Sequence, residues 1–309
     1  MTSDNPPVSM ALPTDQSRPK SQRAETKSLA SGLYLVATPI GNLKDLTFRA
    51  HEVLTSATVI ACEDTRVSRK LLSAYGISTP TLSYHEHNAA RIGPQLIKRI
   101  KNGEAVALVS DAGTPMVSDP GYRLMQDALS ASLPVTTLPG PCAVIAGLCL
   151  SGLPSDRFLF AGFLPNKKGA RQRALAELAA VPATLVFFES PQRIQTCLSD
   201  MAEILGNRPA AVVREITKKF EDCRRGALTE LATHYLQAGP PKGELVVVVG
   251  GAAKESRSTS EKDLDQMLSE ALQSHSTKDA AALVAARCGL PKRGLYERAL
   301  ALKTNRRKE

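Results

Sequence analysis

The sequence contains no tryptophan, and only 4% of its residues are aromatic. It also lacks the closely spaced cysteine pairs of zinc-binding and disulfide-rich proteins, because its six cysteines are scattered along the chain. We therefore expect reduced thiols in a cytosol, and neither a disulfide framework nor a zinc cluster. The scarcity of aromatic side chains argues against a nucleic-acid surface built broadly from base stacking, and it favours recognition of shape and backbone.

No stretch of the chain has the composition of a membrane span. Residues 128–155 carry no charge, but they contain four prolines and three glycines. A transmembrane helix needs about 20 uninterrupted apolar residues, so this stretch is expected to be buried in a water-soluble fold. No apolar segment before Leu33 could act as a secretory signal. We therefore expect a cytoplasmic protein with no membrane partner.

The net charge of +9 is concentrated near the C-terminal end. Residues 287–308 hold eight basic side chains against one acidic residue, Glu297. Such a segment suits the phosphate backbone of a nucleic acid, and a solvated tail explains it equally well. Residues 1–31, in contrast, are rich in proline, serine, threonine and charge, which predicts a disordered extension.

From Leu33 onward, short apolar runs alternate with segments of helical periodicity. This alternation predicts an α/β fold with a parallel βα sheet in residues 32–152. The segment SGLPSDRF then leads into a second, mixed α/β domain at residues 153–252. Residues 258–309 are expected to form a basic helical segment, in which two helices meet at residues 289–291. They resemble a helix–turn–helix motif, and a small helical cap is the alternative.

The ends of four predicted strands carry the residues most suited to a ligand site. They are followed by TPIGN, by CEDTR with Glu63, by SDAGTPMVSDPG (110–121) and by LPGPCA (138–143). The carboxyl ends of parallel strands meet at one edge of a sheet, which is where ligands bind in such folds. The sequence therefore predicts a site at this edge.

The first of these loops is poorly suited to a phosphate. A pyrophosphate requires a glycine-rich turn that lets the backbone approach it, whereas Pro39 removes a backbone donor and Ile40 adds bulk. A nucleoside cofactor without phosphate fits better, and S-adenosylmethionine is such a cofactor. Asp111 and Asp119 are the acids best placed to meet its hydroxyl and cationic groups, although both lie in strong turn sequences. Glu63 suits a ribose contact in the rival architecture, an ordinary Rossmann fold.

Seven sequence blocks resemble one known family. In chain order they are LYLVATPIGNLKDLTFRAHEVL, ACEDTRVSRKLL, ALVSDAGTPMVSDPGYRL, LPGPCAVIAGLCLSGLPSDRFLFAGFLP, FFESPQRI, REITKKFE and KGELVVVVGG. They are similar to the ribosomal RNA small subunit methyltransferase I family of the tetrapyrrole methylase superfamily. The resemblance implies a homodimer of two-domain subunits that binds S-adenosylmethionine between the domains. The activity it implies is 2′-O-methylation of a decoding-centre cytidine in 16S ribosomal RNA, and the expected partner is RNA rather than DNA.

The resemblance also implies particular cofactor-binding residues, which are Pro39, Asp111, Ala112, Gly113, Thr114, Val117, Cys142, Ala143, Phe188 and Glu189. A weakly nucleophilic ribose hydroxyl benefits from a general base, for which Asp119 and Glu63 are the candidates. The chemistry requires no metal, although His85 and His87 lie close enough together to form a ligand pair. Candidate RNA-binding side chains are Arg66, Arg69, Arg193, Arg214, Lys218, Lys219, Lys292 and Arg293. A tetrapyrrole methyltransferase and a non-catalytic RNA-binding protein are the competing interpretations.

Overall fold

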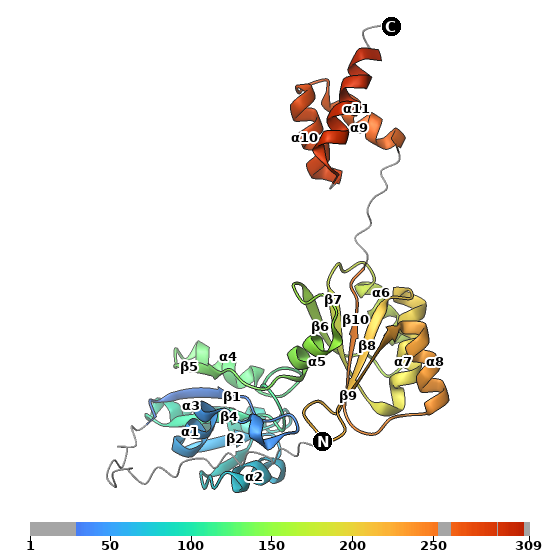
Figure 1. Ribbon diagram of the computed structural model, residues 1–309. Helices are drawn as coiled ribbons and strands as arrows, with labels where there is room; N and C mark the ends of the chain where they lie inside the picture. Colours follow the sequence, from blue (N-terminus) through green and yellow to red (C-terminus); the bar gives the residue numbers. More distant parts are fainter. Residues whose placement is uncertain (1–28, 253–260, 289, 306–309) are drawn as a thin grey trace, which may run out of the picture.

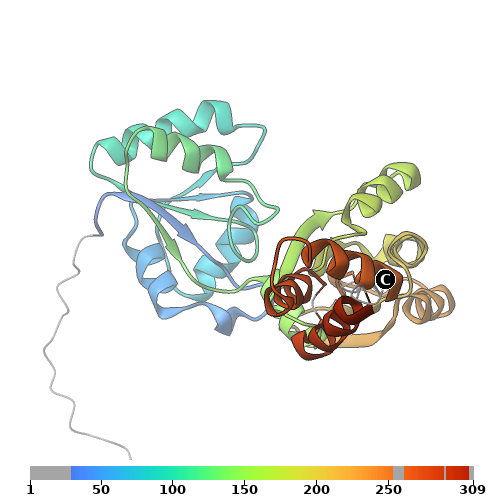
Figure 2. The same cartoon turned by 90° about the horizontal axis from the view of Figure 1, so that it is seen from above.

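The computed structural model describes residues 29–252, 261–288 and 290–305 (Figure 1). Residues 1–28 of the extension predicted for residues 1–31, and the basic side chains at 306–308, lie outside these ranges. Two α/β domains lie side by side in the view of Figure 2, and a separate group of helices follows them in the chain. Within the described residues, no helix combines the length and the hydropathy needed to cross a bilayer.

The first sheet is entirely parallel, in the order β3-β2-β4-β1-β5. Its strands are β1 (Gly32–Val36), β2 (Val59–Cys62), β3 (Thr81–Ser83), β4 (Ala105–Val109) and β5 (Val135–Leu138). The connecting elements are the 3₁₀ turn η1 (Leu43–Asp45), α1 (Phe48–Ser56), α2 (Thr65–Ala74), α3 (Ala89–Lys101) and α4 (Tyr122–Ser130).

Helices cover both faces of this sheet, which explains its apolar strands. On one face α1 and α2 pack against side chains that include Ile60 and Val109, and on the other α3 and α4 pack against Leu33 and Val106. All five residues of β4 are buried. A strand covered on both sides reads as a continuous apolar run, and this is why β1, β2 and β4 could be predicted from the sequence.

The second sheet is mixed, in the order β6-β7-β10-β8-β9. Its strands are β6 (Phe158–Phe163), β7 (Thr184–Glu189), β8 (Pro209–Arg214), β9 (Asp222–Ala227) and β10 (Leu245–Val249), with β6 and β7 parallel and the other pairs antiparallel. The helices α6 (Lys168–Leu178), α7 (Ile194–Leu205) and α8 (Leu228–Ala238) pack on one face, together with the turn η2 (Pro191–Arg193) before α7. The predicted α/β class, with a parallel first sheet and a mixed second domain, is confirmed.

Helix α5 (Ala143–Ser151) joins the two domains. It follows β5 of the first sheet in the chain, but Val144 and Leu148 pack with Val246 and Val248 on the second sheet, on the face opposite α6–α8 (Figure 1). The approach is close, because a Cβ added at Gly147 would lie 2.7 Å from Cγ1 of Val246. The domain boundaries expected from the sequence stay a prediction, and α5 lies on the second sheet although it precedes residue 152.

The C-terminal segment contains three helices with a small core of their own. They are α9 (Glu261–Ala271), α10 (Thr277–Cys288) and α11 (Lys292–Asn305). Leu268, Val284 and Ala299 are buried where the three helices meet. The sequence predicted α10 and α11 but not α9.

The packing of α5 gives a first testable prediction. In Gly147→Val, the new side chain must displace Val246 from a packed interface, so the free energy of unfolding should fall by about 2 kcal/mol. The matched control is Gly169→Val in α6, because no heavy atom lies within 4 Å of a Cβ at that position. Denaturant unfolding of both variants measures the difference, and equal losses would show that α5 does not pack tightly against β10.

Candidate active site

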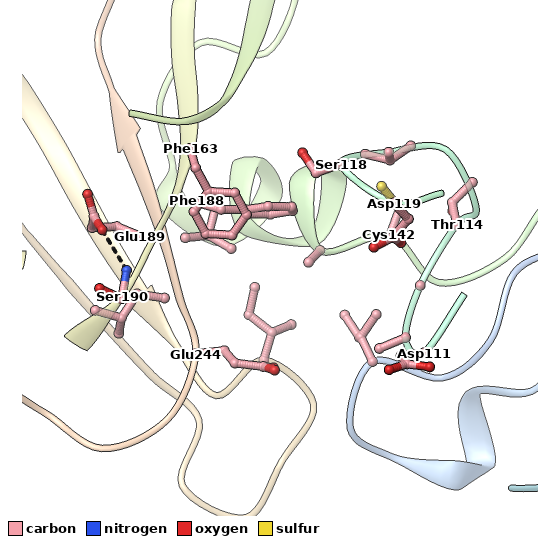
Figure 3. A pocket seen from close by; sticks show the side chains of 18 of the residues that line it. Asp111, Thr114, Ser118, Asp119, Cys142, Phe163, Phe188, Glu189, Ser190 and Glu244 are labelled. Carbon is pink, nitrogen blue, oxygen red and sulfur yellow. Dashed lines mark hydrogen bonds between the residues drawn. The ribbon is translucent and has the colours of Figure 1, made fainter. Parts of the chain in front are cut away.

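A cavity of about 510 Å³ lies between the two sheets (Figure 3). The first domain contributes the carboxyl ends of its strands and the loop at residues 110–121. The second domain contributes the ends of β7 and β10 and the last residue of β6. A volume of this size suits a drug-sized or nucleoside-sized ligand. The predicted gathering of strand ends at one edge is therefore present, with a wall from the second sheet facing it.

The long loop after β4 folds back onto the loop after β1. Thr38 and Gly113 exchange two backbone hydrogen bonds, of 2.9 and 3.0 Å, which form an isolated antiparallel bridge. Gly113 has a φ of +83°, and a Cβ there would lie 3.2 Å from Cγ2 of Ile40. Met116 and Ser118 of this loop also have positive φ values, 73° and 63°. Left-handed backbone at non-glycine residues costs energy and is concentrated at functional sites, so the loop is held in one conformation by its contacts.

Three phenylalanine rings form the apolar wall of the second domain. Phe188 packs against Phe160 with ring centroids 4.9 Å apart, and against Phe163 with centroids 5.5 Å apart. In a regular strand Phe160 and Phe163 would point to opposite faces, but the register of β6 shifts between them and Gly162 has a φ of +64°. This bulge turns Phe163 toward the cavity, where its side chain is still 59% exposed. Phe163 was not predicted from the sequence, in which the glycine inside the apolar strand was the available signal.

The polar part of the lining is acidic. Glu63, Asp111 and Asp119 come from the first domain and Glu244 from the second, whereas the described residues that line the cavity include no lysine or arginine. Asp111 is oriented by the backbone N–H of Asp64, which donates to its Oδ1 at 3.0 Å. Such a lining repels phosphate and attracts a cation or the hydroxyl groups of a sugar.

Asp119 has the most strongly perturbed carboxyl group of the cavity. Burial, with a smaller contribution from the charges of Glu63 and Asp111, raises its pKa to about 6, and a hydrogen bond with Ser110 opposes this rise. Burial and Asp111 also raise the pKa of Glu63. An acid with a pKa near 6 is mostly ionised at neutral pH and is a stronger base than an ordinary carboxylate, which suits general base catalysis.

Glu189 lies at the cavity wall, but its side chain points away from the cavity. Alternate residues of β7 face opposite sides, and Glu189 shares its side with Phe187, which packs under α7, whereas Phe188 faces the cavity (Figure 3). Its Oε2 forms an ion pair with Nη2 of Arg193 at 3.2 Å, and the N–H of Ser190 donates to Oε1 at 2.7 Å. Arg193 also donates to the carbonyl of Leu164 at 2.7 Å. The pair therefore holds the ends of β6 and β7 together beneath the cavity.

The loop between β8 and β9, residues 215–221, closes one side of the cavity. Ile216 lines it, and the hydroxyl of Thr217 accepts a hydrogen bond from the N–H of Asn42 at 3.2 Å. The ammonium group of Lys218 lies 2.8 Å from Glu215 and 2.9 Å from Glu244. This β8–β9 loop thus connects the second domain to the loop after β1.

All predicted cofactor-binding residues except Pro39 line the cavity, as do both candidate bases. Ile40, the neighbour of Pro39, takes that place in the lining, since its side chain reaches Gly113. These positions support the predicted roles without testing them. His85 is hydrogen-bonded to Asn88 in the turn after β3, and no group of three or more potential metal-ligating side chains occurs in the described chain.

The predicted RNA-binding side chains differ in their exposure and in the contacts that they make. Arg69, Lys219 and Lys292 are exposed, and Arg293 lies 3.5 Å from Glu297 on its own helix. Arg66 is 85% exposed and pairs with Asp64 at 2.7 Å. Arg193 and Lys218 are held in the ion pairs described above, which makes them less accessible to a phosphate, and Arg214 donates to the carbonyl of Lys242 at 3.4 Å.

Comparison with known families agrees with this geometry. A profile of the tetrapyrrole (corrin/porphyrin) methylases matches residues 32–232, and one of the RsmI C-terminal HTH domain matches residues 258–303. A ribosomal RNA small subunit methyltransferase I from Mesorhizobium japonicum is 53% identical over 90% of this chain and 94% of its own. The chain belongs to the ribosomal RNA small subunit methyltransferase I family, within the tetrapyrrole methylases. The predicted family is confirmed, and a second member, from Erythrobacter litoralis, is 52% identical over 89% of this chain and 97% of its own.

Solved structures of more distant tetrapyrrole methylases share the fold. A cobalt precorrin-4 methyltransferase covers 71% of this chain and 94% of its own, with a TM-score of 0.53 and 17% identity. A uroporphyrin-III C-methyltransferase from Thermus thermophilus, solved with S-adenyl homocysteine, covers 70% of this chain and 96% of its own, with a TM-score of 0.50 and 22% identity. At such identities the likeness concerns the fold alone.

The raised pKa of Asp119 makes a prediction about stability. Between about pH 4, where an unfolded aspartate loses its proton, and pH 6, the folded state binds more protons than the unfolded state. The contribution of Asp119 to the free energy of unfolding should therefore decrease as the pH rises through this window. Asp119→Asn removes the titrating group, so the stability of the wild type relative to this variant should fall from pH 4 to pH 6 and then level off. Denaturant unfolding of both proteins at several pH values measures this difference. If the two free energies of unfolding change in parallel with pH, the raised pKa of Asp119 is contradicted.

Proposed function

We propose that this protein transfers a methyl group from S-adenosylmethionine to the ribose 2′-oxygen of a decoding-centre cytidine in small-subunit ribosomal RNA. The observation that carries the proposal is the cavity between the domains, whose polar lining is acidic and holds no basic residue among those described. Relatives named ribosomal RNA small subunit methyltransferase I, more than 50% identical to the chain, support the choice of RNA as the substrate. A ribosomal RNA substrate supports the proposal of a cytoplasmic location, where ribosomes are assembled.

The residues present fit S-adenosylmethionine. Its sulfonium and ammonium groups are cations, which suit Asp111 and Asp119, and its sugar hydroxyls suit the same carboxylates. The rings of Phe163 and Phe188 provide an apolar surface for the purine. Gly113 also suits a cofactor site, because a side chain at that position would clash with Ile40 and take up space at the cavity wall. When bound, the cofactor supplies an electrophilic methyl group on a positively charged sulfur.

The chain's own part in the reaction is alignment and proton removal. The two walls hold the reactants in line, and such positioning supplies much of the acceleration in a displacement. We assign Asp119 as the general base, which would accept the proton that the ribose 2′-hydroxyl loses on methylation. Burial makes Asp119 more basic than an ordinary aspartate, and the negative charge of Glu63 adds to this effect. The neutral product of this proton transfer, a carboxylic acid, is the form that the buried setting favours.

The RNA footprint extends from the mouth of the cavity to basic side chains on several elements. Arg66 and Arg69 lie on α2, the helix that follows the strand end carrying Glu63 in the chain. Lys219 lies on the β8–β9 loop. Lys292 and Arg293 begin α11, within the segment that matches the helix–turn–helix profile. Side chains of this kind neutralise phosphates and make binding dependent on salt. We assign Arg193 a positioning role for Glu189 instead of a phosphate contact.

A homodimer is the second part of the proposal. Helix α5 is apolar on all sides, and its outer face leaves Ile145 46% exposed and Cys149 exposed, four residues apart on one stripe. Phe158, at the start of edge strand β6, is 42% exposed. An exposed apolar stripe suits contact with a second copy of the chain, and an unpaired strand edge on the same domain is a further surface that a copy could cover.

The molecular mass of the protein in solution tests the proposed dimer. Sedimentation equilibrium should give twice the chain mass of 33.0 kDa for the wild type and a shift toward the monomer for Ile145→Glu, which would bury a charge in the interface. The control Leu236→Glu changes an apolar side chain that is 67% exposed on α8, behind the opposite face of the second sheet, and should remain dimeric. A wild-type monomer would remove this part of the proposal.

The activity is tested by transfer of a labelled methyl group to small ribosomal subunits from cells that lack the modification. The wild type should be active, and the rate should rise with pH up to about 6, where Asp119 ionises, and then level off. Asp119→Asn should lower kcat by about 100-fold or more while binding of the cofactor is retained. Glu63→Gln is the matched control, and it should lose less activity than Asp119→Asn. The acidic limb of its pH–rate profile should move to lower pH, because a charge that raises the pKa of Asp119 is removed.

Each alternative predicts a different outcome in the same assay. Label found only in a porphyrinoid would favour a tetrapyrrole substrate, and RNA binding without transfer would favour a non-catalytic protein. A larger loss in Glu63→Gln than in Asp119→Asn would reverse the roles of the two carboxylates.

A further inference from the structure

The β8–β9 loop presents a phenylalanine ring to solvent beside the cavity. Phe220 is 64% exposed, in a sequence of 309 residues with only seven phenylalanines and no tryptophan. The same loop lines the cavity through Ile216 and touches the first domain through Thr217, which accepts the N–H of Asn42. The exposed ring is therefore carried by a loop that also forms part of the active site.

This loop is held in an energetically costly conformation. Glu215 and Thr217 have φ values of 52° and 64°, which non-glycine residues seldom adopt. The backbone N–H of Thr217 donates to the carboxylate of Glu221 at 2.6 Å, and the N–H of Lys218 donates to the carbonyl of Glu215 at 2.9 Å. The ion pairs of Lys218 with Glu215 and Glu244 complete the network. The network fixes the loop, yet it leaves the large apolar side chain in water.

The side chain of Lys219 lies next to the ring of Phe220. The ammonium group of Lys219 lies 5.5 Å from the centroid of Phe220, and the side chain of Lys219 is exposed. An aromatic face with an adjacent cation matches a nucleotide, which offers a planar base and a negative phosphate. Lysine is depleted at protein–protein interfaces, so this pairing favours a nucleic acid over a protein partner.

We propose that Phe220 stacks on a base of single-stranded RNA that flanks the methylated nucleotide, and that Lys219 pairs with the adjacent phosphate. The inference rests on the proposed function, since it takes RNA as the substrate. A ribose can reach a cavity between two domains only if its strand leaves the helical stack, and the flanking base then loses a neighbour. The ring of Phe220 replaces that neighbour. One such contact is compatible with the low aromatic content of the chain, which excludes only a broad stacking surface.

The absence of tryptophan provides a direct spectroscopic test. Phe220→Trp gives a protein whose only tryptophan occupies the proposed stacking position, and stacking on a base quenches indole fluorescence. Addition of small ribosomal subunits that lack the modification should quench this variant. The matched control is Leu236→Trp, whose single tryptophan would lie on α8, behind the opposite face of the second sheet. Its fluorescence should change little, although cosedimentation shows equal binding of subunits.

Kinetics provides the second measurement. Phe220→Ala should raise the KM for subunits by about tenfold, the effect expected from loss of one stacked base. Its kcat and its affinity for S-adenosylmethionine should be unchanged, because the ring is not part of the cavity lining. Phe220→Trp should restore the KM, and Leu236→Ala should match the wild type.

The results separate this inference from the proposed function. If the wild type methylates the subunits but Phe220→Ala keeps its KM and Phe220→Trp is not quenched, stacking is overturned and the methyltransferase function stands. A change of sedimentation mass in Phe220→Ala would assign the ring to a protein interface, which also overturns stacking. If the wild type transfers no methyl group to ribosomal RNA, the proposed function fails and this inference fails with it.

Discussion

The close packing of α5 on β10 is the contact on which the site depends. It attaches the end of the first domain to a face of the second sheet, and Gly147 allows the approach because any side chain there would meet Val246. The same apolar cluster includes Ile40, Val117 and Cys142 of the first domain, so the loops that line the cavity belong to the interdomain core. Packed cores resist small deformations, and the two walls of the cavity are therefore held at a set separation. The site is a property of the interface and belongs to neither domain alone.

The chemistry of the cavity follows from this closure. Glu63 and Asp119 are partly removed from water at the cavity wall, and burial is the largest cause of the raised pKa of Asp119. The aromatic wall comes from the second domain, where a bulge in β6 places Phe163 beside Phe188. A cationic cofactor with an apolar purine fits between an acidic wall and an aromatic one. A phosphate-bearing cofactor finds no basic group among the described residues of the lining.

The sequence predicted most of the fold, because the buried parallel strands are continuous apolar runs and the strand-end loops lie next to them. Strand β9 was missed because its sequence, DCRRGA, sits at an exposed edge and has no apolar alternation. The packing of α5 on the second sheet could not be predicted, because the sequence of an apolar helix does not indicate which sheet the helix will cover. Phe163 was missed for a similar reason, as its direction depends on the bulge at Gly162. Glu189 lies at the cavity wall, and its contact with the cofactor stays a prediction. Its side chain faces α7, and the sequence alone does not indicate which face of β7 meets a ligand.

The shape of the cavity predicts that one ligand is held by both domains at once, and hydrogen exchange can measure this. Backbone amides of residues 111–119 and of residues 188–190 and 243–246 are followed with and without S-adenosylmethionine. The structure predicts that the cofactor slows exchange in both groups together, with the same dependence on cofactor concentration, because both groups line one cavity. Protection confined to the first group, with residues 188–190 and 243–246 unchanged at saturation, would contradict a site shared between the two sheets.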